Sequence, residues 1–168
     1  KDGNAYIDDF EGSETSIDMK SFSAWSLSST PDYGQFKSDA ELSNDLKYGF
    51  NRALLAWYVI DPLFLRNNSL TPDHIAKNPE SQSSHYVKEV FEEDIFPEKE
   101  NPNNVPTNIS VLNLAYYPQE RGPYNYDTLN VNSNGTLKDS EDRWGGVMRE
   151  LQSTDFETSN IQFIEFWL

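Results

Sequence analysis

The segment 51–60 (NRALLAWYVI) is the most apolar run in the chain, and it constrains the fold more than any other stretch. Its apolar side chains occupy both alternating sets of positions, so neither face of a strand formed here would be polar. Such a run is typical of a central strand covered on both sides, and periodicity alone leaves a buried helix as the alternative. Pro62 sets its end, because the residue before a proline avoids helical backbone angles.

Most of the remaining chain also has strand character. Segments 6–10, 21–28 and 108–117 read as strands, and a change of face at 111–112 indicates a bulge in the last of them. The pair Asn134-Gly135 lies between two short apolar stretches and predicts a hairpin. A turn and a bend are also predicted. Residues 118–123, with a proline at each end, are expected to form a turn, and Gly145-Gly146 a bend or a close backbone approach.

Residues 67–96 are expected to be a helical insertion into this β-rich chain. Thr71-Pro72-Asp73 has the features of a helix start, with proline in the first turn. Apolar side chains then follow at helical spacing: Tyr86, Val87, Val90, Phe91 and Ile95. Residues 97–106 (PEKENPNNVP) have no periodicity and are expected to form a polar loop.

A length of 168 residues suits one domain with its own core, so we treat residues 1–168 as a single domain. Aromatic residues make up 14% of the chain, and they pack well on pleated surfaces. We therefore expect a mainly β fold, a sandwich with a core rich in aromatic rings. The apolar run 163–168 calls for continuation, so we expect the chain to be a segment of a much larger polypeptide.

The net charge of −15, from 28 acidic and 13 basic side chains, restricts the partners. A nucleic acid would be repelled, and an anionic membrane surface is disfavoured for the same reason. No stretch approaches the roughly 20 apolar residues of a spanning helix, so we expect no membrane span in this segment. A divalent cation is the class of partner that such a surface favours most.

Catalytic motifs are not found in the sequence. The two histidines, His74 and His85, are separated by a proline and are expected to lie on the surface. There is no cysteine, which excludes a thiol nucleophile, a disulfide and a zinc–thiolate site. Pairs of carboxylates for glycoside hydrolysis could be assembled, but a chain this acidic forms such pairs by chance. We expect the protein not to be an enzyme.

A calcium site is the most plausible ligand site. Asp8, Asp9 and Glu11 place several hard oxygen ligands within four residues, and the turn that follows could add backbone carbonyls. Asp155, Glu157 or Glu165 could complete the shell if the two ends of the chain are neighbours, and we take Asp155 as the candidate. The alternative is that these carboxylates are solvated charges at the ends of strands.

Four tyrosines could instead form a platform on which sugar rings stack: Tyr116, Tyr117, Tyr124 and Tyr126. The proline at 118 separates the first pair from the second. Packing in the core and in turns is the simpler expectation for all four.

Four long blocks of the sequence resemble one family of proteins. They are AYIDDFEGSETSIDM at 5–19, RALLAWYVIDPLF at 52–64, LNLAYYPQERGPYNYD at 112–127 and EDRWGGVMRELQSTDFETSNIQFIEFWL at 141–168. These blocks are similar to the SprA/Sov family, the giant translocons of the type IX secretion system in the outer membrane of Bacteroidota.

The resemblance implies a non-catalytic, soluble domain of a β-barrel protein that passes folded cargo across the outer membrane and supports gliding motility. It also implies the partners: the rest of the translocon barrel, a PorV-type protein and secreted cargo with a C-terminal sorting domain. The domain would lie on the periplasmic or the extracellular face of the cell outer membrane.

A second, looser resemblance concerns the two ends of the chain. Asp-Asp-Phe-Glu at 8–11 and the later Asp-Phe and Phe-Ile-Glu-Phe-Trp segments at 155–156 and 163–167 are similar to galactose-binding-like jelly rolls and carbohydrate-binding modules. It implies a jelly-roll β-sandwich, continuing beyond Leu168, whose first strand contributes to a structural calcium site. A carbohydrate-binding module of a cell-surface protein is therefore the alternative function.

If calcium binds to Asp8, Asp9, Glu11 and Asp155, adding the ion should raise the melting temperature, because a ligand that binds only the folded state stabilises it. Differential scanning fluorimetry in calcium and in a chelator measures the effect, with magnesium as the control ion. Identical melting temperatures in calcium and chelator would argue against the site.

Overall fold

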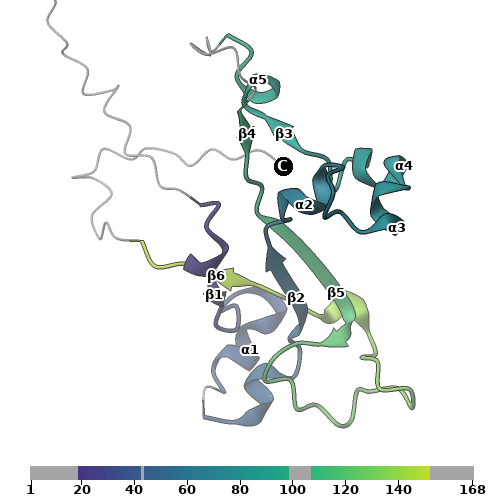
Figure 1. Ribbon diagram of the computed structural model, residues 1–168. Coiled ribbons are helices and arrows are strands. Elements are labelled where there is room, and N and C mark those ends of the chain that lie inside the picture. The colour runs from purple at the N-terminus through teal and green to yellow at the C-terminus, as the bar shows by residue number, and fades with distance from the viewer. Residues whose placement is uncertain (1–18, 43, 99–106, 152–168) are drawn as a thin grey trace, which may run out of the picture.

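The computed structural model describes residues 19–42, 44–98 and 107–151, which form short helices and small antiparallel sheets (Figure 1). The strands are β1 (Ser26–Leu27), β2 (Ala53–Tyr58), β3 (Val90–Phe91), β4 (Asn108–Ile109), β5 (Asn113–Arg121) and β6 (Val147–Met148). The α-helices are α1 (Lys37–Ala40), α2 (Pro62–Leu65), α3 (Asp73–Ala76), α4 (Pro79–Ser83) and α5 (Glu92–Ile95). The 3-10 helices are η1 (Phe22–Ala24), η2 (Gly34–Phe36), η3 (Leu46–Gly49) and η4 (Ser140–Asp142).

The longest element pair is the antiparallel ribbon of β2 and β5, which runs through the middle of the molecule (Figure 1). Directly opposed pairs run from Tyr58 and Asn113 to Leu54 and Tyr117. The register then shifts, so that Ala53 pairs with Arg121 and residues 118–120 form a bulge. Pro118 is accommodated there because a bulged residue does not have to donate to the ladder.

Both faces of the ribbon are apolar, as the sequence of 51–60 predicts. Leu55, Trp57, Leu114 and Tyr116 share one face, while the other carries Leu54, Ala56, Tyr58, Ala115 and Tyr117. The expected strand is confirmed, but the expected cover on both sides is not observed among the described residues. Ala53 is buried, the next four residues of β2 are half-buried and Tyr58 is exposed.

The chain segment that follows Arg143 crosses one face of the ribbon. Trp144 pairs with Arg52 in a parallel bridge, and the backbone at Gly145 then comes so close to the ribbon that a Cβ there would lie 3.0 Å from the Leu55 Cβ. A Cβ on Gly146 would lie 2.5 Å from the Ser28 hydroxyl oxygen. The close approach predicted for Gly145-Gly146 is therefore confirmed, and it leads β6 to its partner β1.

Helices α2, α3 and α4 follow β2, and α2 and α4 are stabilised by side-chain capping at their N-termini. The Asp61 carboxylate accepts from the Leu63 amide at 2.8 Å, and the Asn78 side chain accepts from the Ser81 amide at 3.1 Å. The buried Thr71 hydroxyl lies 2.7 Å from the Arg66 carbonyl oxygen, which holds the connection between α2 and α3. The start of α3 at Asp73 follows the predicted Thr-Pro-Asp signal.

Three expectations about local structure are wrong. The apolar stripe at 86–95 does not form one helix, because Val90 and Phe91 pair with β4 as β3, and Tyr86 is exposed. Residues 118–121 continue β5, so the predicted turn begins only at Gly122. Segment 21–28 forms η1 and a two-residue strand in place of one strand. In the first two cases pairing with a distant strand determined the backbone, and the local pattern did not.

The predicted hairpin at Asn134-Gly135 is confirmed. Val131 pairs with Leu137, and the Asn132 amide donates to the Thr136 carbonyl at 2.8 Å. Gly135 has a φ of 90°, a value that glycine adopts readily because it has no Cβ.

The expected mainly β, jelly-roll sandwich is not confirmed. Residues 19–42, 44–98 and 107–151 contain comparable amounts of helix and strand, and their strands form three separate two-stranded antiparallel sheets. Among the described residues we find no helix with the length and hydrophobicity that a membrane span requires.

Gly122 provides a direct test of this packing, because a Cβ there would overlap the Ala53 carbonyl group. Replacing Gly122 by alanine should reduce the free energy of unfolding by about 3 kcal/mol, at the upper end of typical overpacking costs. Gly34→Ala is the control, since its surroundings are open and only its φ of 58° is unfavourable, which costs about 1 kcal/mol. Urea denaturation measures both; equal losses would contradict the close approach.

Candidate functional site

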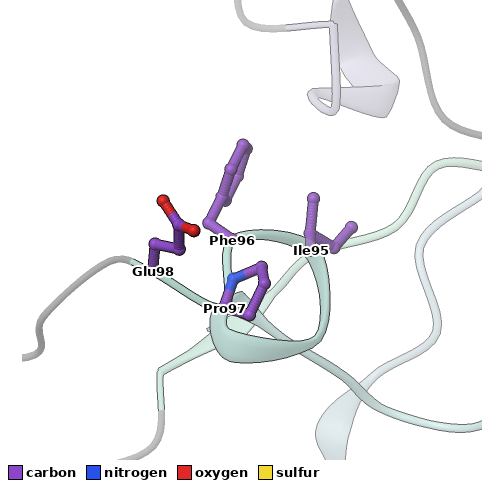
Figure 2. A pocket seen from close by; sticks show the side chains of 4 residues that line it. All are labelled: Ile95, Phe96, Pro97 and Glu98. Carbon is purple, nitrogen blue, oxygen red and sulfur yellow. The ribbon is translucent and has the colours of Figure 1, made fainter.

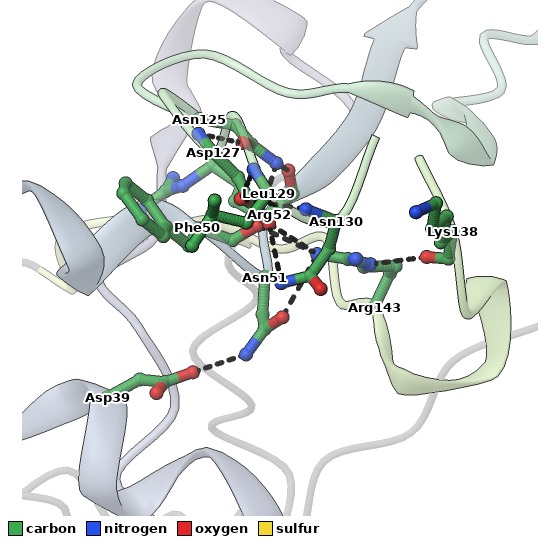
Figure 3. A network of polar contacts seen from close by, with 10 residues as sticks. All are labelled: Asp39, Phe50, Asn51, Arg52, Asn125, Asp127, Leu129, Asn130, Lys138 and Arg143. Carbon is green, nitrogen blue, oxygen red and sulfur yellow. Dashed lines mark hydrogen bonds and ion pairs between the residues drawn. The ribbon is translucent and has the colours of Figure 1, made fainter. Parts of the chain in front are cut away.

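Buried residues in the described part of the chain are mostly polar. Three apolar side chains are buried there, namely Ala53, Leu137 and Trp144. Six polar or charged residues are buried in the same ranges: Thr30, Arg52, Thr71, Asn125, Asp127 and Arg143. Four of these six belong to one network of polar contacts, which is the most distinctive site in the structure (Figure 3).

Asp127 is at the centre of the network and has no exposed surface. Its Oδ1 accepts hydrogen bonds from the amides of Leu129, at 2.8 Å, and Asn130, at 3.2 Å. Its Oδ2 accepts from the Asn130 side-chain amide at 3.1 Å and lies 3.8 Å from the Arg143 guanidinium. A buried carboxylate needs such partners, because the loss of hydration is otherwise too costly.

These contacts determine how Asp127 ionises. Burial alone would raise the pKa of Asp127, but the amides of Leu129 and Asn130, the Asn130 side chain and the positive charge of Arg143 oppose it, and the pKa is lowered from its ordinary value of 3.8. The carboxylate is therefore ionised in the folded protein at neutral pH.

Asn125 joins the loop that contains Asp127 to the start of β2. Its side-chain amide donates to the carbonyl oxygens of Phe50, at 2.9 Å, and Arg52, at 2.7 Å. Its side-chain oxygen accepts from the Asp127 amide at 3.0 Å. One buried side chain thus bonds three backbone groups from two segments of the chain.

Arg143 brings a third segment into the network. It donates to the Phe50 carbonyl oxygen at 2.9 Å, to the Asn51 side-chain oxygen at 3.0 Å and to the Lys138 carbonyl oxygen at 3.0 Å. Asn51 in turn donates to Asp39 in α1 at 2.6 Å. The network therefore ties four segments together: α1, the start of β2, the loop after β5 and the segment that leads to β6 (Figure 3).

A second buried cation, Arg52, contributes its backbone carbonyl to the network, and its side chain lies against Trp144. Its guanidinium is 4.5 Å from the centroid of the Trp144 ring, which itself packs against Phe36 with ring centroids 6.4 Å apart. Burial lowers the pKa of Arg52, opposed by the hydroxyl groups of Tyr48 and Tyr124, and the side chain stays charged because a guanidinium does not deprotonate in proteins. The ring quadrupole of Trp144 partly replaces the lost hydration.

The arrangement does not resemble a catalytic site. The carboxylate of Asp127 is fully enclosed, and each of its oxygen atoms is already occupied by a donor. A general base has to reach a substrate proton, and a buried, saturated carboxylate does not. The network's chemistry is therefore structural: it fixes the backbone on which nearby exposed side chains are displayed.

The residues expected to bind calcium, Asp8, Asp9, Glu11 and Asp155, all lie outside the described residues, so that site stays a prediction. Within 19–42, 44–98 and 107–151, no three potential ligands from histidine, aspartate and glutamate come together as a metal site. Both histidines are exposed, as expected, and the His85 ring packs edge-on against Tyr86.

The four tyrosines of the possible sugar platform are all exposed, so the expected packing in the core and in turns is not observed. They do not form one surface, because Tyr116 and Tyr117 are neighbours in β5 and point to opposite faces of the ribbon. Tyr124 and Tyr126 lie apart from them, on the loop that the network holds.

A shallow recess of about 550 Å³ lies at the end of α5, lined by Ile95, Phe96, Pro97 and Glu98 (Figure 2). Its lining combines three apolar side chains with one carboxylate at the edge. Among the described residues, Glu98 is the one ionisable group in its lining.

Sequence reasoning missed Asp127, Asn125 and Arg143. Asn and Asp at alternate positions after a Gly-Pro pair indicate only a turn. Nothing in the sequence shows that an arginine 16 residues later would supply the counter-charge, because that pairing depends on where β5 and the hairpin direct the chain.

No protein-family model matches the chain, and no curated protein matches it either.

The Asp127–Arg143 pair should be the most sensitive point of the fold. Asp127→Asn leaves the buried guanidinium of Arg143 without its counter-charge, and we expect a loss of about 3 kcal/mol in the free energy of unfolding. Asp142→Asn, a matched change at an exposed position in η4, should have almost no effect. Equal stability of the two variants in urea denaturation would contradict the role of the pair.

The same carboxylate should make the fold sensitive to acid. Because the pKa of Asp127 is lower in the folded than in the unfolded chain, its contribution is present above the unfolded pKa, near 3.8, and is lost as the pH falls through the folded pKa. The melting temperature of the native protein should therefore fall more steeply below about pH 4 than that of Asp127→Asn. Parallel slopes would show that another group governs acid unfolding.

Proposed function

We propose that the chain is a non-catalytic structural or interaction domain of a giant outer-membrane translocon of the type IX secretion type. In this role it would work with the rest of the translocon barrel, a PorV-type protein and secreted cargo that carries a C-terminal sorting domain. The observation that carries the proposal is the exposure of large apolar side chains on both faces of the β2–β5 ribbon.

The ribbon exposes large apolar side chains on both of its faces. Leu114 is 57% exposed and Tyr116 42% on one face, while Tyr58 is 43% and Tyr117 45% exposed on the other. An isolated two-stranded ribbon is marginally stable in water, and contiguous apolar surface on a folded protein commonly marks an interaction site. A domain that packs inside a larger assembly would have such faces, and a secreted enzyme would not need them.

The blocks that resemble the translocon family support the proposal in a second way. RALLAWYVIDPLF includes β2 and most of α2, LNLAYYPQERGPYNYD includes β5 and Asp127, and the start of the last block supplies Arg143 and Trp144. These three blocks, far apart in the sequence, contact one another around the buried network. The resemblance thus concerns residues that act together in space.

We also propose that the complete domain is a jelly-roll sandwich. The three two-stranded antiparallel sheets would be portions of two larger facing sheets, each completed by further strands of the same polypeptide or of a partner. The apolar faces of the β2–β5 ribbon would then be covered by the facing sheet.

Cell fractionation tests the proposal. An antibody raised against residues 19–151 should detect a single, very large band in the outer-membrane fraction of the source cells. Removing this segment from the chromosomal copy should abolish the release of cargo with a C-terminal sorting domain, while an inner-membrane marker protein stays unchanged. A small band in the culture fluid, or normal cargo release by the deletion strain, would refute the proposal.

A further inference from the structure

Residues 122–137 (GPYNYDTLNVNSNGTL) differ in charge from the rest of the chain. They contain a single ionisable side chain other than tyrosine, Asp127, and that side chain is completely buried. In the whole chain 24% of residues are charged and the net charge is −15. The surface of this segment is therefore neutral, and it consists of aromatic, amide and hydroxyl groups.

The buried network holds the first part of this segment in a fixed conformation. Gly122, Asn125 and Asp127 point into the protein and are buried. Between them, Tyr124 and Tyr126 point outward and are 67% and 53% exposed. Because the inward residues are fixed by hydrogen bonds to Phe50, Arg52 and the loop itself, the outward rings are displayed on a rigid backbone.

The backbone conformation of Tyr124 shows how firmly the protein fixes the position of this exposed side chain. Its φ of 64° is in the left-handed region, which is uncommon for any residue with a side chain. The tyrosine carbonyl is packed so closely against Gly49 that a Cβ on that glycine would lie 2.5 Å from the carbonyl oxygen. Unfavourable backbone angles of this kind cluster at binding sites.

We propose that Tyr124 and Tyr126 form a binding site for a neutral oligosaccharide. Tyrosine rings offer apolar faces to the C–H groups of a sugar, and their hydroxyl groups can take part in hydrogen bonds. Exposed side chains with amide and hydroxyl groups follow directly along the chain, at positions 128, 130, 132, 133 and 134. This combination of flat apolar rings and uncharged hydrogen-bonding groups suits a ligand that is rich in hydroxyl groups and has no charge.

Two alternative ligand classes fit less well. An anionic ligand, such as a sulfated or sialylated glycan, would approach a protein of net charge −15 and find no exposed cation between residues 122 and 137. A large protein interface is also less well supported, because this segment offers few large apolar anchors, with Leu129 the main one beside the two rings. The proposal is independent of the translocon assignment.

The test uses a panel of neutral oligosaccharides built from glucose, mannose, galactose and N-acetylglucosamine, with sialylated and sulfated glycans beside them. Isothermal titration calorimetry of the full chain should detect binding to at least one neutral member. The double variant Tyr124→Ala/Tyr126→Ala should bind it roughly tenfold or more weakly, as expected for the loss of two stacking contacts. The double variant Tyr33→Ala/Tyr86→Ala removes two tyrosines elsewhere that are even more exposed, and it should bind like the native chain.

Each other outcome overturns the proposal. A folded native chain that binds no neutral member refutes it, as does a preference for the charged glycans. An equal loss in the two double variants would show that the binding does not involve this loop. If photo-crosslinking from position 126 captures a protein partner while no glycan binds, the loop is a protein-recognition site. The melting temperature of each variant is measured first, so that a loss of binding is not confused with a loss of folding.

Discussion

The contact between the buried carboxylate of Asp127 and the buried guanidinium of Arg143 lies at the centre of a network that joins four segments of the chain. Neither side chain stands alone, because Asn125, Asn130 and backbone groups from three segments complete the hydrogen bonding of both. A buried ion pair of this kind contributes little net stability relative to an apolar pair of the same shape, but removing one partner is costly. Its effect is to specify which segments meet, and it thereby fixes the geometry of the loop after β5.

The buried network has to determine which segments meet, because the apolar core is small. The three buried apolar side chains, one of them an alanine, do not fix the arrangement of four chain segments, and the β2–β5 ribbon keeps much of its apolar surface exposed. Directional hydrogen bonds take over the positioning that dense apolar packing performs in most domains. The exposed faces of the ribbon and the displayed tyrosine loop are then two distinct surfaces on one polar framework. The first suits cover by protein, the second a small neutral ligand.

Structural features that depend on nearby residues could be predicted from the sequence, and features that depend on contacts between distant segments could not. The strand at 51–60, the hairpin at Asn134-Gly135 and the close approach at Gly145 were predictable, since runs of apolar residues and glycines act on the backbone where they occur. The helical stripe at 86–95 failed because pairing with β4 outweighed a local pattern. The Asp127–Arg143 pair could not be found at all, since its partners meet only after β5, the loop and the hairpin have turned the chain back.

Native-state hydrogen exchange of the backbone amides tests the central claim most directly, because it ranks the stability of each segment in the intact fold. If the buried network is the framework, the slowest amides should include those of Leu129 and Asn130, which donate to Asp127, and that of Ala53, which donates to Trp144. The amides of α3 and α4 should exchange much faster. Slow exchange in these helices, with fast exchange at Leu129 and Asn130, would contradict the account.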